Sequence, residues 1–125
     1  PAILLICSIL DDAELHDYMQ LADELHLDVL TETHSAGEIE RAVNAGARII
    51  GVNNRNLKNF QVDVSNSLKL RSLAPKDCLF VSESGIKTRS DIEKLEANGT
   101  DAVLIGETLM RAADKKAMLD TLRGV

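Results

Sequence analysis

Carboxylate, amide, arginine and glycine residues follow the short apolar segments of this 125-residue chain, and these residue types can transfer protons and hold an anion. Glu32 lies in the alternating segment VLTET, where apolar neighbours would partly desolvate its carboxylate. Desolvation raises the pKa of a carboxyl group and suits it to proton transfer near neutral pH. Glu32 is therefore a candidate proton-transfer residue, but its position alone does not favour this role over that of a solvated acid at a strand end, because structural ion pairs also perturb pKa values.

Two glycine-containing turns, Glu83-Ser84-Gly85 and Ile105-Gly106-Glu107, are the candidates for an anion site. Glycine lets the backbone approach a ligand closely, and the start of a following helix presents free N–H groups to an anion. Arg55 follows the amide pair Asn53-Asn54, and an arginine at a strand end can clamp a carboxylate with two parallel hydrogen bonds. A surface ion pair is the alternative for Arg55. The sequence has no GxGxxG motif and so lacks the dinucleotide-binding fingerprint.

The histidines and cysteines show no metal-ligand spacing, and we expect no metal site. His16 and His26 are expected on the surface, whereas His34 follows the VLTET segment closely enough to be a candidate for ligand proximity. Cys7 and Cys78 lie in apolar runs and are expected to be buried free thiols.

Composition excludes some partners. The formal net charge is −6 and aromatic residues make up 2%, so the chain lacks the basic stripe and the stacking residues of a nucleic-acid-binding protein. No apolar run approaches the roughly 20 residues needed to span a bilayer, and no signal-peptide pattern opens the sequence. We therefore expect no membrane partner and a cytoplasmic location.

The elements that position these residues alternate between short apolar segments, expected as buried strands, and longer amphipathic ones, expected as helices. This alternation implies an α/β fold with a parallel sheet covered by helices. A doubly wound, flavodoxin-like sheet and a segment of a (β/α)₈ barrel both fit, and both gather ligands at the carboxyl ends of their strands. Strands are expected near 2–7, 28–33, 48–52, 78–82 and 102–105. Helices are expected after Asp11-Asp12, after Ser35 with Glu38 completing a capping box, from near Ser65, after Lys87-Thr88, and as one final helix from Met110 to Leu122.

Five segments carry a resemblance to a known family: AILLI (2–6), LTETH (30–34), GVNNRNL (51–57), VSESGIK (81–87) and LIGETLMR (104–111). In order and spacing they resemble the last five strands of indole-3-glycerol-phosphate synthase. The resemblance implies a partial TIM (β/α)₈ barrel of about five βα units, with 1–125 as one domain and three N-terminal βα units absent. It also implies a carboxy-lyase of tryptophan biosynthesis that needs no cofactor or metal. This enzyme closes the indole ring of 1-(2-carboxyphenylamino)-1-deoxyribulose 5-phosphate with loss of CO₂ and water.

The resemblance implies roles for the matching residues. Glu32 is the general base of the dehydration steps, and Glu83 acts with Asn53 and Ser84 to orient and stabilise the intermediates. Arg55 faces the anthranilate carboxylate of the substrate. The apolar slot for the aromatic ring is lined by Leu4, Ile6, Leu57 and Leu104. The phosphate cradle is formed by Gly85, Gly106 and the backbone N–H of Glu107. The carboxylate of Glu107 is expected to turn to solvent.

The chain also departs from the family. Two essential lysines, on the first and third strands of the family, have no counterpart, because Lys58, Lys76 and Lys87 lie in loops of the wrong position. We therefore expect the chain alone to be inactive as a synthase. Five strands cannot close an eight-stranded barrel, so the open strand edges are expected to drive self-association or pairing with the missing N-terminal half.

Two other functions fit parts of the pattern. A half-barrel phosphate-binding module without catalysis would use the glycine turns alone. A receiver-type domain would need an aspartate and a lysine at the strand ends where this chain has Asn53 and Gly106, and fold analogy alone is a weak argument for it.

Overall fold

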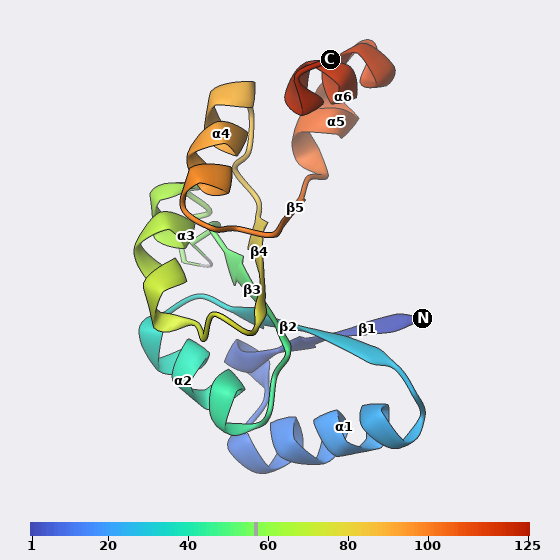
Figure 1. Cartoon of the computed structure of the whole chain (residues 1–125), viewed down its shortest axis with the longest axis vertical. Helices are drawn as coiled ribbons and strands as arrows, with labels where there is room; N and C mark the ends of the chain where they lie inside the picture. Colours follow the sequence, from blue (N-terminus) through green and yellow to red (C-terminus); the bar gives the residue numbers. More distant parts are fainter. Residues whose placement is uncertain (57) are drawn as a thin grey trace.

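The computed structural model describes residues 1–56 and 58–125 and shows a five-stranded parallel sheet (Figure 1). Leu57, expected to line the apolar slot, lies outside the described residues. The strands are β1 (Ala2–Ile6), β2 (Asp28–Thr33), β3 (Ile49–Asn53), β4 (Leu79–Glu83) and β5 (Ala102–Leu104). The helices are α1 (Asp12–Glu24), α2 (Ala36–Asn44), α3 (Ser65–Leu70), α4 (Arg89–Ala97), α5 (Glu107–Arg111) and α6 (Lys115–Arg123), with 3₁₀ turns η1 (Cys7–Ile9) and η2 (Arg71–Leu73).

The strand order decides between the two architectures that the sequence left open. The strands follow one another in space in the order β1-β2-β3-β4-β5, and every neighbouring pair is parallel. A flavodoxin-like sheet has the order 2-1-3-4-5 instead. Right-handed crossovers between successive neighbours place their helices on one face of the sheet, as in a barrel wall. In Figure 1, α2, α3 and α4 lie along the same side of the strands. The predicted partial barrel is confirmed.

The core lies between this helical layer and the sheet. Its central side chains are Ile50, Val52 and Phe80, all fully buried, and both cysteines are buried free thiols beside them, as predicted. The opposite face of the sheet is open. On it, Leu4 is 48% exposed and Leu104 is 53% exposed, which is unusual for large aliphatic residues of a sheet.

The helix starts follow the predicted capping residues with one difference. The Asp11 carboxylate accepts from the Glu14 backbone N–H at 2.8 Å and begins α1. Ser35 Oγ accepts from the Glu38 N–H at 3.2 Å and begins α2. The predicted capping box at α2 is wrong, because the Glu38 carboxylate accepts from the His34 N–H at 3.1 Å and not from that of Ser35.

The prediction of a single final helix is also wrong. The chain becomes extended at Ala112, which ends α5, and Asp114 begins α6 by accepting from the Ala117 N–H at 3.0 Å. The competing cap at Asp114 was the signal in the sequence for this break. Within the part of the chain that the structure describes, no helix has the length and apolar character needed to cross a membrane.

Candidate functional site

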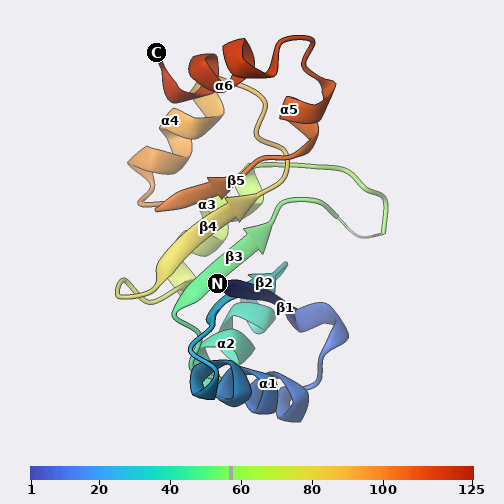
Figure 2. The ribbon, with the colours of Figure 1, turned by 90° about the vertical axis from the view of Figure 1, so that its right-hand side faces the viewer.

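The carboxyl ends of the strands border a cleft of about 950 Å³ on the open face of the sheet. The arrowheads of β3, β4 and β5 point to the same edge in Figure 2. Ten of the predicted site residues line this cleft: Leu4, Glu32, Asn53, Arg55, Glu83, Ser84, Gly85, Leu104, Gly106 and Glu107. Ile6 does not line it, although it is the partner of Glu32 in the β1–β2 register.

Strand register places the two candidate carboxylates side by side on the open face. Glu32 on β2 is the register partner of Gly51 on β3, and Asn53 is the partner of Glu83 on β4. Partners in a parallel sheet point to the same face, so Glu32, Asn53 and Glu83 all project toward the cleft. Both carboxylates are buried, since Glu32 is 8% exposed and Glu83 is 3% exposed.

Glu83 is the most strongly perturbed carboxyl group of the site. Burial, and then the negative charge of Glu32, raise the pKa of Glu83 to about 8. Its Oε2 is buried and has no hydrogen-bond partner in the described residues. The raised pKa favours the protonated form of the Glu83 carboxyl group, which lines the cleft beside Glu32.

Gly51 makes this arrangement possible, and the sequence analysis did not assign it a role. A Cβ at position 51 would overlap Glu83 Oε2 and would lie 3.1 Å from Leu30 Cδ1. The Glu83 carboxylate thus occupies the space that a side chain on β3 would fill. An isolated glycine inside a strand pattern is a signal of such a close approach.

Asn54 is a second residue whose role was missed. It is 4% exposed, and its amide nitrogen donates to Ser82 Oγ at 2.9 Å and to the Ser84 carbonyl at 3.0 Å. Its amide oxygen accepts from the N–H and the hydroxyl of Ser67 at 3.0 and 2.7 Å. This buried network joins β3, β4 and α3, and it holds the turn that carries Ser84.

The Ser84-Gly85 turn is held in a conformation that side chains disfavour. Ser84 has φ 68° and Gly85 has φ 77°, both in the left-handed region. A Cβ on Gly85 would overlap Val62 Cγ1, so only glycine lets the β3–α3 loop lie against this turn. A left-handed serine costs backbone energy and is a feature of functional sites.

Arg55 joins the β3 end of the cleft to the turn after β5. Its Nη2 lies 2.7 Å from Glu107 Oε2, and Arg111 Nε lies 3.0 Å from Glu107 Oε1. Hydrogen bonds from Arg55 and then Arg111 lower the pKa of Glu107. The Glu107 side chain is 52% exposed, as expected for a carboxylate that turns to solvent, but Arg55 and Arg111 also hold it at the rim of the cleft. The Thr108 hydroxyl also donates to the Ile86 carbonyl at 2.6 Å, which ties the two glycine turns together.

The remaining candidates lie around this site or away from it. His34 is outside the cleft, with its Nε2 3.9 Å from Glu32 Oε2. Lys87 is exposed and lines the cleft, whereas Lys58 lines a neighbouring polar cleft. Across residues 1–56 and 58–125, no cluster of three or more His, Cys, Asp or Glu side chains is arranged to hold a metal ion.

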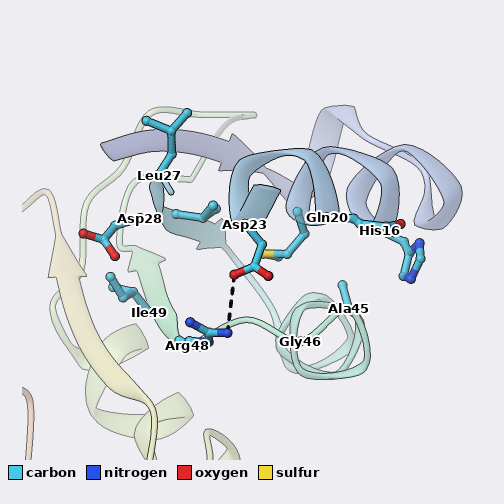
Figure 3. Close-up of a pocket in the computed structure, with 11 residues that line it drawn as sticks. His16, Gln20, Asp23, Leu27, Asp28, Ala45, Gly46, Arg48 and Ile49 are labelled. Atoms are coloured by element: carbon cyan, nitrogen blue, oxygen red, sulfur yellow. Dashed lines mark ion pairs between the residues drawn. The ribbon is translucent and has the colours of Figure 1, made fainter. Parts of the chain in front are cut away.

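A separate, smaller cavity of about 230 Å³ lies between α1 and the start of β3 (Figure 3). Asp23 and Arg48 form an ion pair across it at 3.6 Å, and His16 on its rim is exposed, as predicted. The cavity is lined by residues near the amino ends of β2 and β3, such as Asp28 and Ile49, and by no predicted site residue. Conserved chemistry in barrels lies at the other end of the strands, so this cavity is unsuited to be the site.

Comparison with known proteins points to one family. A family model described as indole-3-glycerol phosphate synthase matches residues 1–122. The protein of that name from Leuconostoc mesenteroides is 58% identical over 122 residues, which are 98% of this chain and 47% of the relative. The one from Ruminiclostridium cellulolyticum is 55% identical over the same shares of the two chains. The chain thus spans about half the length of these relatives.

Solved structures agree on the fold. The 3-hexulose-6-phosphate synthase of Salmonella typhimurium superposes with a TM-score of 0.81 at 13% identity, over 98% of this chain and 60% of that one. Thiamine phosphate pyrophosphorylase from Pyrococcus furiosus gives 0.75 at 17% identity, over 98% and 57%. At such low identity the likeness shows the shared barrel fold alone.

Proposed function

The chain belongs to the indole-3-glycerol phosphate synthase family, and we propose that it forms the carboxyl-terminal, catalytic half of such an enzyme. The reaction closes the indole ring of 1-(2-carboxyphenylamino)-1-deoxyribulose 5-phosphate and releases CO₂ and water. The observation that carries the proposal is the single cleft in which the Glu32–Glu83 pair, Arg55 and both glycine turns meet. We place this activity in the cytoplasm, where the composition of the chain led us to expect it.

The two carboxyl groups supply the acid–base chemistry. Environments that push the pKa values of two neighbouring acids apart assign them different roles. Glu83, with its raised pKa, holds a proton and donates hydrogen bonds to the intermediates. Glu32 then acts as the base that removes a proton during dehydration. Asn53 and Ser84 flank this pair on the cleft wall and orient the reacting atoms.

The substrate's two ends are held by different parts of the cleft. Arg55 binds the anthranilate carboxylate, for which Glu107 stands in when no substrate is bound. The backbone N–H groups of Gly85, Gly106 and Glu107 hold the phosphate. Leu4 and Leu104, which are half exposed on the open face, pack against the aromatic ring.

The open face and the uncovered edges of the sheet are a surface to which a partner could bind. β1 and β5 are the terminal strands of the sheet, so each has one edge that no other strand of the sheet covers. We propose that the amino-terminal half of the family's barrel pairs with these edges and covers the open face. Self-association through the same edges is the alternative. The size-exclusion mass of the chain, measured with and without added amino-terminal half, distinguishes the two. A shift to the mass of a one-to-one complex supports pairing with that half, and a mass that stays that of the self-associated chain supports self-association.

Activity assays test the proposal. We expect the 125-residue chain alone to convert no substrate, because the lysines of the family's first and third strands are absent from it. A joined protein, in which the amino-terminal half of the Leuconostoc mesenteroides relative precedes this chain, is expected to form indole-3-glycerol phosphate. In that protein Glu32→Gln lowers kcat by roughly 10²–10⁴-fold, the usual contribution of a general base. Turnover by the chain alone, or none by a folded joined protein, contradicts the proposal.

A second candidate is a phosphate-binding half-barrel that does no chemistry. The Thr108–Ile86 hydrogen bond favours it, because this contact fixes the two glycine turns relative to each other without any need for the carboxylates. Titration of the joined protein with inorganic phosphate, together with the activity assay, separates the two functions. Binding without turnover supports the second candidate.

A further inference from the structure

His34 lies immediately after β2, between two carboxylates that face different clefts. Its Nε2 is 3.9 Å from Glu32 Oε2, and its Nδ1 is 3.6 Å from Glu38 Oε1 on α2. Glu32 lines the cleft of the proposed active site. His34 and Glu38 line the neighbouring polar cleft of about 500 Å³. The imidazole therefore separates the buried acid pair from a second opening to solvent.

The surroundings of the ring are unusual for a structural histidine. Its side chain is 14% exposed, and both ring nitrogens are buried without a hydrogen-bond partner in the described part of the chain. Buried polar atoms without partners are rare and costly. Each nitrogen nevertheless faces a carboxylate oxygen within 4 Å, a gap that a small side-chain rotation closes.

Glu38 is itself fixed toward His34. Its Oε1 accepts from the His34 backbone N–H at 3.1 Å, in place of the capping-box bond that its sequence position predicted. The cap of α2 is thus rearranged so that this carboxylate lies beside the imidazole.

We propose that His34 is a positioning residue that connects Glu32 to Glu38 and passes protons between the buried carboxyl pair and the polar cleft. The proposal rests on the role of Glu32 as the base. A proton taken up by Glu32 moves from its carboxyl group to Nε2, while the proton on Nδ1 moves to Glu38 and then to water. Glu32 regains its negative charge, Glu38 returns to its own, and the neutral imidazole changes tautomer. Passage of a proton in the opposite direction, from Glu38 to Nδ1 and from Nε2 to Glu32, restores the first tautomer.

Several other titratable groups surround the series Glu32, His34 and Glu38. Glu83 on β4 faces Glu32, and the Cys7 thiol donates to the Glu38 carbonyl at 3.8 Å. Arg41 on α2 donates to the Cys7 carbonyl at 3.0 Å, and its positive charge interacts with Glu38. Around the two clefts, the further titratable side chains are Arg55, Lys58, Asp63, Lys69, Lys87, Glu107 and Arg111. The imidazole is the group that stands between Glu32 and Glu38.

NMR titration of the 125-residue chain tests the connection without any need for activity. The ¹⁵N shifts of the His34 ring are followed from pH 5 to pH 10 in the wild type and in Glu83→Gln. We expect a step in the His34 shifts at the pH where Glu83 titrates, and its loss in Glu83→Gln. His16, an exposed histidine beside Asp17, is the control and is expected to titrate identically in both proteins. A His34 curve that is the same in both proteins overturns the proposal.

Kinetics of the joined protein give a second readout. His34→Ala is expected to lower kcat roughly 10–100-fold with little change in KM, a typical cost of losing a group that orients a catalytic residue. Added imidazole is expected to restore part of this activity, which a purely structural loss would not allow. His16→Ala leaves kcat unchanged. A His34→Ala protein with normal kcat, or one that imidazole does not rescue, overturns the relay. An inactive wild-type joined protein contradicts the synthase function instead, while the titration still tests the connection.

Discussion

Replacing Glu83 by glutamine is expected to raise the free energy of unfolding by roughly 2–4 kcal/mol at pH 9 and to change it little below pH 4.5. The pKa of Glu83 in the folded protein, about 8, lies above the ordinary value of 4.5 for a glutamate. The folded protein therefore binds a proton that the unfolded chain has released between these two values. The stabilisation that this proton provides is present at low pH and is lost as the pH rises through about 8. Glutamine has no such proton to lose, so the variant gains in relative stability across this range.

Urea unfolding at pH 4, 7 and 9 measures this difference. Glu40→Gln, which changes an exposed carboxylate on α2, is the matched control, and we expect its effect to be small at every pH. A Glu83→Gln difference that stays constant between pH 4 and pH 9 contradicts the burial of an uncompensated carboxyl group at this position.

Adding one methyl group at Gly51 is expected to disable the site. The Cβ of Gly51→Ala would occupy the position of Glu83 Oε2, so the carboxylate has to leave its place beside Glu32. Overpacking of this kind costs about 1–3 kcal/mol of stability. In the joined protein, a displacement of about 1 Å at a catalytic group is expected to lower kcat about 100-fold.

Gly37→Ala is the control for this substitution. Gly37 lies in the first turn of α2, where a Cβ would meet no atom within 4 Å, so alanine is expected to raise stability by about 0.5–1 kcal/mol. Thermal unfolding and kcat are measured for both variants. A Gly51→Ala protein with the stability and kcat of the wild type would show that Glu83 does not need the space above β3.

Much of the fold followed from local patterns in the sequence. Apolar segments and capping residues such as Asp11 and Ser35 predicted strands and helix starts, because hydrophobic period and capping act over a few residues. The strand order was left open by these patterns, and the resemblance of segments such as GVNNRNL decided in favour of the barrel. The sheet order and the family match confirm that decision.

The features that the sequence could not predict depend on contacts between distant segments. No sequence signal near Glu107 predicts that Arg55, 52 residues away, pairs with its carboxylate. The apposition of Glu83 and Gly51 depends likewise on the register of two strands. Asn54 is as polar as Asn53, and only the packing of α3 shows that it is the buried one. The sequence thus showed which side chains could do chemistry, and the fold showed which residues contact them.

The central claim is that the strand ends form one anion-binding cleft. NMR tests it most directly, by mapping the contacts of indole-3-glycerol phosphate on the ¹⁵N- and methyl-labelled chain. We expect the backbone amides of Gly85 and Gly106 and the methyl groups of Leu4 and Leu104 to shift together as the ligand is added. Shifts confined to the cavity around Asp23 and Arg48, with those four residues unaffected, would contradict it.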